Sequence, residues 1–150
     1  MSADGARGAA TIRAAAVTDY PALYAAAARC GPAARDVLPG ATTFAARVSE
    51  GSVLVAVHDE AIVGYLLASP LAYDGNAPVS LWIDAVAVVP DWRRRGLATA
   101  LCAALAAART LGTRALLASP PSDPALAALL ARVGFVAHRE GVLLWRLGEA

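Results

Sequence analysis

The stretch "DAVAVVPDWRRRGLATALCAALAAAR" (84–109) places a valine-rich run, a proline, three arginines and a glycine directly before an alanine-rich helical pattern. Pro90 ends a central strand because it has no N–H to donate. The first N–H groups of a helix have no internal partner and carry partial positive charge. Gly96 lets the backbone approach a ligand closely, since it has no Cβ. This order predicts a strand followed by an anion-binding helix start.

Neighbouring residues support the same interpretation of this turn. Ala98 keeps the next inward position small, and the Thr99 hydroxyl adds a hydrogen-bonding group. The alternative is a solvated arginine loop in which Gly96 only makes a turn. The stretch lacks the GxGxxG pattern of dinucleotide sites and the Gly-Lys-Ser/Thr of a P-loop. The type of anion therefore stays open at this level.

Composition limits the classes of protein that the chain can represent. Its 150 residues, 58% of them apolar, predict a flexible N-terminal arm (1–9) and a single domain (10–150). The net charge of +1 argues against a charge-driven nucleic-acid or membrane partner. All 13 basic residues are arginine, so no lysine nucleophile exists. No apolar run reaches the length of a membrane span, and a cytoplasmic location is expected.

Metal chemistry is not expected either. The two cysteines, Cys30 and Cys102, suggest neither a disulfide framework nor a metal site, and Cys102 is expected in the core. His58 and His138 lie far apart in sequence, without ligand spacing, and are interpreted as surface residues. We therefore expect no metal ion.

Periodicity predicts alternating strands and helices. Strands are expected at 11–17, 52–57, 61–69, 79–89 and 113–119, and in a closing hairpin around Gly141; helices are expected at 18–31, 41–50, 95–112 and 123–134. Residues 31–40 and 70–78 are expected as loops. The order predicts an α/β (α+β) domain with helices on both faces of a mixed sheet. The 79–119 unit should be a right-handed parallel crossover.

The hexapeptide Arg93-Arg94-Arg95-Gly96-Leu97-Ala98 resembles the Arg/Gln-x-x-Gly-x-Gly/Ala motif of the GNAT superfamily of acyl-CoA N-acyltransferases. The preceding "AVAVVPDW" is similar to that family's strand end, and the element order agrees over residues 10–147. The resemblance implies the GNAT fold, a mostly antiparallel sheet of about seven strands. It also implies acetyl-CoA as co-substrate.

By the same resemblance, the pyrophosphate of coenzyme A would bind the amides of residues 94–99, and its pantetheine arm would run along 86–88. A bulge in this strand would free the amide of Val88 to polarise the thioester carbonyl. The resemblance assigns cofactor contacts to Val86, Ala87, Val88, Arg93, Arg94, Arg95, Gly96, Leu97, Ala98, Thr99 and Asp123.

Asp84 is a charged residue inside the apolar run "LWIDAVAVV", which calls for a partner or a function. Alternation places it on the face of Trp82, Val86 and Val88. The family resemblance implies a base for the attacking ammonium, whereas pairing with an arginine or capping a loop is the alternative.

The second GNAT motif is only partly present. Counting back from Gly134-Phe135 puts Asp123 where asparagine is usual and Leu130 where a tyrosine commonly protonates the thiolate. Ser119, Ser122 or solvent would have to replace that acid.

The resemblance thus implies an acetyl-CoA-dependent N-acetyltransferase in which a primary amine attacks the thioester directly. The acceptor it implies is a small-molecule amine or a protein amino group, and the final strand of this fold can pair across subunits in a homodimer. A GNAT-fold sensor that holds acyl-CoA without turnover is the alternative, favoured by the missing tyrosine. Binding of another phosphate ligand at the same turn is a third.

Overall fold

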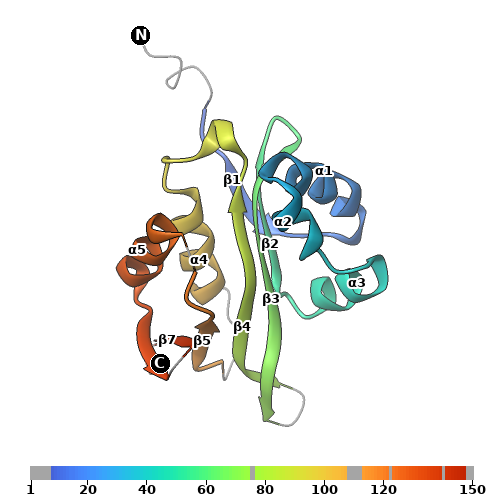
Figure 1. Cartoon of the computed structure of the whole chain (residues 1–150). Helices are drawn as coiled ribbons and strands as arrows, with labels where there is room; N and C mark the ends of the chain where they lie inside the picture. Colours follow the sequence, from blue (N-terminus) through green and yellow to red (C-terminus); the bar gives the residue numbers. More distant parts are fainter. Residues whose placement is uncertain (1–7, 75–76, 108–112, 122, 140, 148–150) are drawn as a thin grey trace.

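The computed structural model describes residues 8–74, 77–107, 113–121, 123–139 and 141–147. They form a seven-stranded sheet in the order β1-β2-β3-β4-β5-β7-β6, in which the β4–β5 pair is parallel and the other pairs are antiparallel (Figure 1). The strands are β1 (Thr11–Ala14), β2 (Val53–His58), β3 (Ala61–Asp74), β4 (Ala77–Val88), β5 (Ala115–Ala118), β6 (Val136–Arg139) and β7 (Val142–Arg146). The mixed, mostly antiparallel sheet and the parallel crossover are as predicted.

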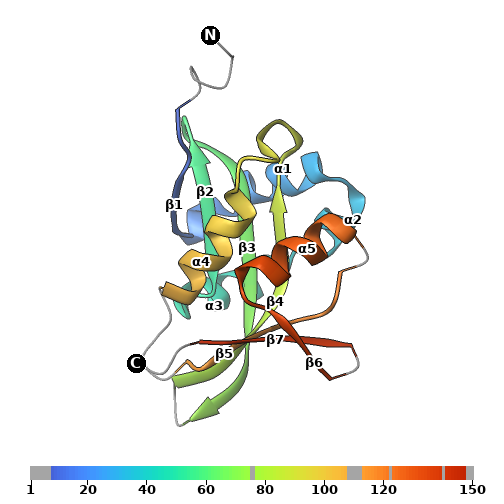
Figure 2. The same cartoon turned by 90° about the vertical axis from the view of Figure 1, so that its left-hand side faces the viewer.

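Helices cover both faces of this sheet, as Figures 1 and 2 show together. One face carries α1 (Tyr20–Cys30), α2 (Pro32–Asp36) and α3 (Ala41–Ser49); the other carries α4 (Leu97–Ala107) and α5 (Pro124–Val133). The 3-10 turns η2 (Val17–Asp19) and η3 (Pro90–Trp92) lead into α1 and toward α4. Across the described ranges, every helix is too short or too polar to pass through a bilayer.

Two segments differ from the sequence-based expectation. The expected loop at 70–78 is a strand up to Asp74 and again from Ala77, because β3 and β4 continue their pairing and so satisfy their backbone hydrogen bonds. The expected connection at 31–40 contains the short helix α2, which starts at Pro32, a residue compatible with the first helical turn.

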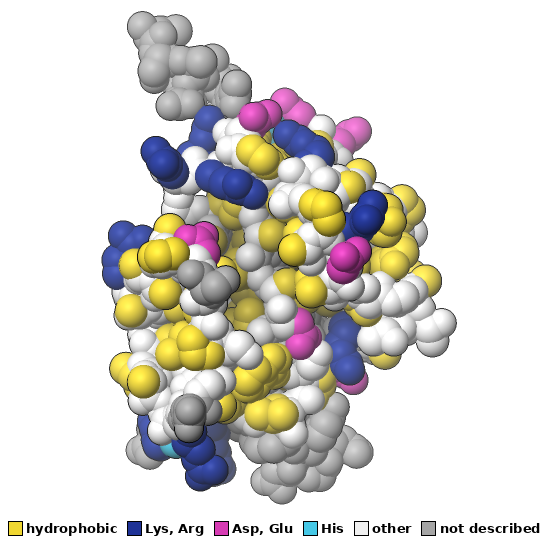
Figure 3. Space-filling model, in the orientation of Figure 1, with side chains coloured by type: hydrophobic (Ala, Val, Ile, Leu, Met, Phe, Trp, Pro, Cys, Tyr) yellow, Lys and Arg dark blue, Asp and Glu magenta, His cyan; other side chains and the backbone are white. Residues whose placement is uncertain are grey.

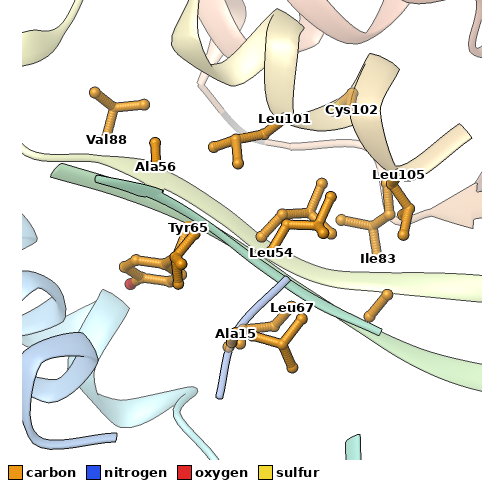
Figure 4. Close-up of a cluster of buried hydrophobic side chains, with 14 of the residues drawn as sticks. Ala15, Leu54, Ala56, Tyr65, Leu67, Ile83, Val88, Leu101, Cys102 and Leu105 are labelled. Carbon is orange, nitrogen blue, oxygen red and sulfur yellow. The ribbon is translucent and has the colours of Figure 1, made fainter. Parts of the chain in front are cut away.

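The hydrophobic core fills both sides of the sheet. Figure 4 shows Val88, Leu101 and Cys102 on the α4 side, and Tyr65 and Leu67 on the opposite side. Cys102 is fully buried, as expected, and burial raises the pKa of its thiol to about 11. The Tyr65 hydroxyl is buried without a hydrogen-bond partner among the described residues, and burial raises its pKa to about 12.

The sheet opens between β4 and β5. Their pairing covers Ser80–Ile83 against Ala115–Ala118, and beyond Ile83 the described part of the chain gives β4 no partner on this side. Figure 1 shows the upper half of β4 standing apart from β5. One edge of β4 is therefore left with backbone groups that are not used in the sheet.

The turn between β1 and α1 depends on one carboxylate. Asp19 accepts hydrogen bonds from Arg13 Nη1 (2.7 Å), Arg13 Nη2 (3.0 Å) and the Ala16 N–H (2.7 Å). The Arg13 hydrogen bonds are the main reason why the pKa of Asp19 lies below its usual value. A lowered folded-state pKa means that the stabilisation is present at neutral pH and is lost as pH falls through that pKa.

We therefore expect Asp19→Asn to lower the free energy of unfolding by about 1 kcal/mol at pH 7, a modest value because the Arg13 side chain is half exposed. The difference from the parent should shrink below about pH 4, where an unfolded aspartate becomes protonated. Urea denaturation at pH 7 and pH 3 measures both. Asp36→Asn, at an exposed 3.7 Å pair with Arg35, is the control and should change little; an Asp19→Asn effect independent of pH would contradict the assignment.

Candidate active site

A β-bulge places Asp84 at the point where β4 leaves β5. Leu67 of β3 is opposite Ala85, and Ala68 is opposite Ile83, so Asp84 is the extra residue of β4. The bulge interrupts the alternation on which the face prediction relied. Val88 lies on the α4 side (Figure 4), and alternation puts Val86 on the same face. Trp82 is opposite Ser69, which shares the other face with Leu67. The prediction that these three residues share one face with Asp84 is therefore wrong.

The Asp84 carboxylate is exposed and accepts a hydrogen bond from the Ser69 hydroxyl. Within the described ranges, no ion pair involves Asp84, so the arginine partner considered as an alternative is not seen there. A carboxylate held by a hydroxyl and open to solvent retains acceptor positions for an incoming ammonium.

Two cavities meet at Asp84. The first, about 340 Å³, lies on the α3 side and is lined by Thr43, Arg47, Val53, Leu67, Ser69 and Asp84, among others. The second, about 180 Å³, lies in the opening between β4 and β5, where its walls include Asp84, Val86, Ser119, Leu126 and Leu130. Asp84 is the residue common to both. The bulge thus places one acidic residue at the border of two separate spaces.

The start of α4, which follows β4 and the turn η3, presents backbone N–H groups of its first turn. Within the described residues, Ala100 is the first residue of α4 whose N–H has a carbonyl partner, the Gly96 oxygen at 2.9 Å. Arg94 (φ 64°) and Gly96 (φ 79°) both adopt left-handed backbone conformations. A Cβ built on Gly96 would meet no atom within 4 Å, so the space above the turn is open. Leu97, Ala98 and Thr99 follow as the first residues of the helix. This arrangement fits an anion such as a diphosphate.

The three arginines take different positions. Arg93 Nε donates to the Val88 carbonyl at 2.9 Å, so this side chain braces β4. The Arg95 guanidinium lies 4.8 Å from the ring centre of Trp92. The ring centre of His58 also lies 4.8 Å from that of Trp92. Arg94 is exposed. The turn therefore does not direct all three charges toward a single point.

Val88 lies in regular register opposite Gly64, four residues after the bulge. The bulge that we expected to free the Val88 amide is thus located at Asp84 instead. The Val89 N–H bonds the Val63 carbonyl in β3 at 2.9 Å. Because successive N–H groups of a strand alternate in direction, those of Val86 and Val88 point to the open edge of β4, and the intervening N–H of Ala87 points to β3.

The second motif carries no acid at the expected position. Leu130 is buried and lines the smaller cavity at the place implied for the family tyrosine. Asp123 caps α5, its carboxylate accepting the Ala125 N–H at 2.9 Å. Ser119 lines the same cavity as Leu130, and Ser122 lies outside the described residues. Among the described residues, Ser119 is therefore the one with a hydroxyl group that lines the smaller cavity.

Sequence reasoning missed Ser69 and Arg47. Ser69 ends an apolar run and Arg47 belongs to a helix with mixed exposure, so no local pattern distinguishes them. Their placement results from pairing between β3 and β4 and from α3 packing over the sheet. No group of three or more His, Cys, Asp or Glu side chains in the described part of the chain is placed to hold a metal ion.

Residues 20–135 match the sequence pattern of the acetyltransferase (GNAT) family. The chain belongs to the GNAT family. No curated protein matches its sequence closely enough to add a nearer relative.

Solved GNAT structures superpose over nearly the whole chain. The ribosomal-protein-S18-alanine N-acetyltransferase of Escherichia coli is 20% identical, with a TM-score of 0.71 over 94% of this chain and 96% of that one. A phosphinothricin acetyltransferase of Sinorhizobium meliloti, solved with acetyl-CoA, is 21% identical, with a TM-score of 0.71 over 94% and 90%. The GphF GNAT-like decarboxylase, in complex with isobutyryl-CoA, is 19% identical, with a TM-score of 0.71 over 92% and 100%. At these identities the likeness shows the GNAT fold.

Proposed function

We propose that this GNAT protein is an acetyl-CoA-dependent N-acetyltransferase that acts on a primary amine. The observation that carries the proposal is the position of Asp84, a carboxylate shared by two cavities. Direct transfer of an acetyl group requires that the two bound substrates meet at one point, which adjoining cavities would allow. The similar acetyltransferases of ribosomal protein S18 and phosphinothricin support the reaction class.

The chain offers binding groups for the pyrophosphate, the pantetheine arm and the acyl oxygen of acetyl-CoA. The amides of residues 94–99, around Gly96, would hold the pyrophosphate, and the open edge of β4 at Val86 and Val88 would hold the pantetheine arm. Bound acetyl-CoA supplies the thioester acyl group. The Val88 N–H, which points to the same edge, would donate a hydrogen bond to the acyl oxygen.

Asp84 would prepare the amine. An ammonium ion cannot attack, so a proton must leave it before or during attack. The exposed Asp84 carboxylate accepts that proton directly or through water. The Ser69 hydroxyl holds the carboxylate in position between the two cavities. Ser119 or solvent would supply the proton that the departing thiolate takes up.

A non-catalytic acyl-CoA sensor is the second candidate, and one observation favours it. Leu130 fills the position of the usual acid with a buried hydrocarbon side chain. The GphF neighbour is a decarboxylase, so the fold by itself does not select acetyl transfer. We place the sensor second because an exposed carboxylate at the bulge serves no evident purpose in binding alone.

The deciding experiment measures CoA release from acetyl-CoA in the presence of a panel of primary amines. Turnover above the amine-free rate supports the enzyme, whereas a thermal shift with acetyl-CoA and no release with any amine supports the sensor. A larger shift with ATP than with acetyl-CoA would favour another phosphate ligand.

The homodimer is also part of the proposal. The edge strand β6, which has four exposed residues, is where a second copy would pair.

A further inference from the structure

The larger cavity carries one charge of each sign. Of the residues that line it, Arg47 and Asp84 are the charged ones, and its walls otherwise include Val37, Val53 and Leu67. Figure 3, in the orientation of Figure 1, shows acidic and basic side chains next to each other near the middle of the visible face. The cavity thus offers an anion, a cation and an apolar wall within one small space.

Arg47 is held in place by its own helix turn. Its Nη1 lies 2.9 Å from Glu50 Oε2, and both side chains are about one-third exposed (29% and 32%). An arginine has five N–H donors, and this ion pair uses a part of them. The guanidinium therefore remains able to donate to a second carboxylate in the cavity.

We infer that the acceptor is a small zwitterion, an α-amino acid or a close analogue, whose ammonium binds Asp84 and whose carboxylate binds Arg47. This inference rests on the proposed acetyl transfer, since it names the substrate class of the same site. A diamine or polyamine fits poorly, because its second ammonium would face the like charge of Arg47. An amine without an anionic group would leave unused the N–H donors of Arg47 that the Glu50 pair does not occupy.

The size of the cavity agrees with this class. A volume of about 340 Å³ lies at the lower end of small-molecule sites. The apolar wall gives the side chain of an amino acid a surface to cover, which favours aliphatic over charged side chains. The Ser69 hydroxyl, already bonded to Asp84, fixes the ammonium end of the cavity.

The test compares matched ligands by two readouts. A panel of L-amino acids is titrated into the CoA-loaded protein by calorimetry, and CoA release is followed in parallel with acetyl-CoA. For the amino acid that binds best, its methyl ester, its decarboxylated amine and putrescine are compared. We expect the free amino acid to bind about 10–100-fold more tightly than the other three, as charge-assisted hydrogen bonds would require.

Variants assign the effect to Arg47. Arg47→Gln should weaken amino-acid binding about 10–100-fold while leaving the decarboxylated amine unaffected, and Arg47→Lys should restore part of the loss. Arg35→Gln, at an exposed position of α2, is the matched control and should leave both ligands unchanged.

Equal binding of the amino acid, the ester and the amine to the parent protein would overturn the inference, and this comparison does not depend on the folding of any variant. Absence of amino-acid binding across the panel would overturn it as well. Selective binding without CoA release would instead support the zwitterion site and contradict the acetyltransferase, so the two failures are distinguishable.

Discussion

Replacing Asp84 by asparagine should lower kcat by about 10²–10⁴-fold, the range expected when a general base is removed. The isosteric amide keeps the hydrogen bond with Ser69 but cannot take a proton from the ammonium. Acetyl-CoA affinity should stay close to the parent value, because the proposed pyrophosphate site lies at the start of α4. Steady-state kinetics with the best acceptor, together with calorimetry for acetyl-CoA, measures the two effects separately.

Asp59→Asn is the matched control for this substitution. Asp59 is exposed in the β2–β3 turn, lines neither cavity and has a left-handed backbone (φ 48°), which asparagine tolerates. It should leave kcat unchanged. If Asp84→Asn retained full turnover with unchanged KM for the amine, the carboxylate would play no part in proton removal, and solvent would have to act as the base.

Substituting alanine for Gly96 should weaken acetyl-CoA binding by about 10–100-fold, which corresponds to roughly 1.5–3 kcal/mol. A methyl group would enter the open space above the turn, and the positive φ of 79° would be strained for any residue with a Cβ. Both effects move the amides away from the pyrophosphate. Calorimetry with acetyl-CoA measures the loss directly.

Gly141→Ala separates ligand binding from backbone strain. Gly141 has a nearly identical backbone (φ 76°) and equally open surroundings, but it lies in the β6–β7 turn (Figure 2). Both variants should lose similar stability, about 1–2 kcal/mol for a left-handed alanine. Only Gly96→Ala should lose acetyl-CoA affinity; equal affinities for the two variants would place the pyrophosphate elsewhere.

Local sequence patterns determined most of the fold and the position of the turn at Gly96. The apolar run before Pro90, the glycine after three arginines and the alanine-rich helix are adjacent in sequence, and their interactions span only a few residues. The local preferences of these segments agree with the global fold, as is typical of natural sequences. The GNAT family and the succession of the main helices and strands along the chain could therefore be predicted before any coordinates.

Tertiary structure alone decided what surrounds Asp84. Sequence alternation wrongly put Val86 and Val88 on the face of Trp82, because one extra residue in a strand reverses every side chain beyond it. The contact with Ser69 joins residues 15 positions apart, and Arg47 of α3 and Leu130 of α5 reach this region from opposite faces of the sheet. Such contacts depend on the register between strands and on how helices pack over them, and neither is encoded in a local pattern. The motif identified where a diphosphate would bind, and the folded sheet determined which side chains face the acceptor.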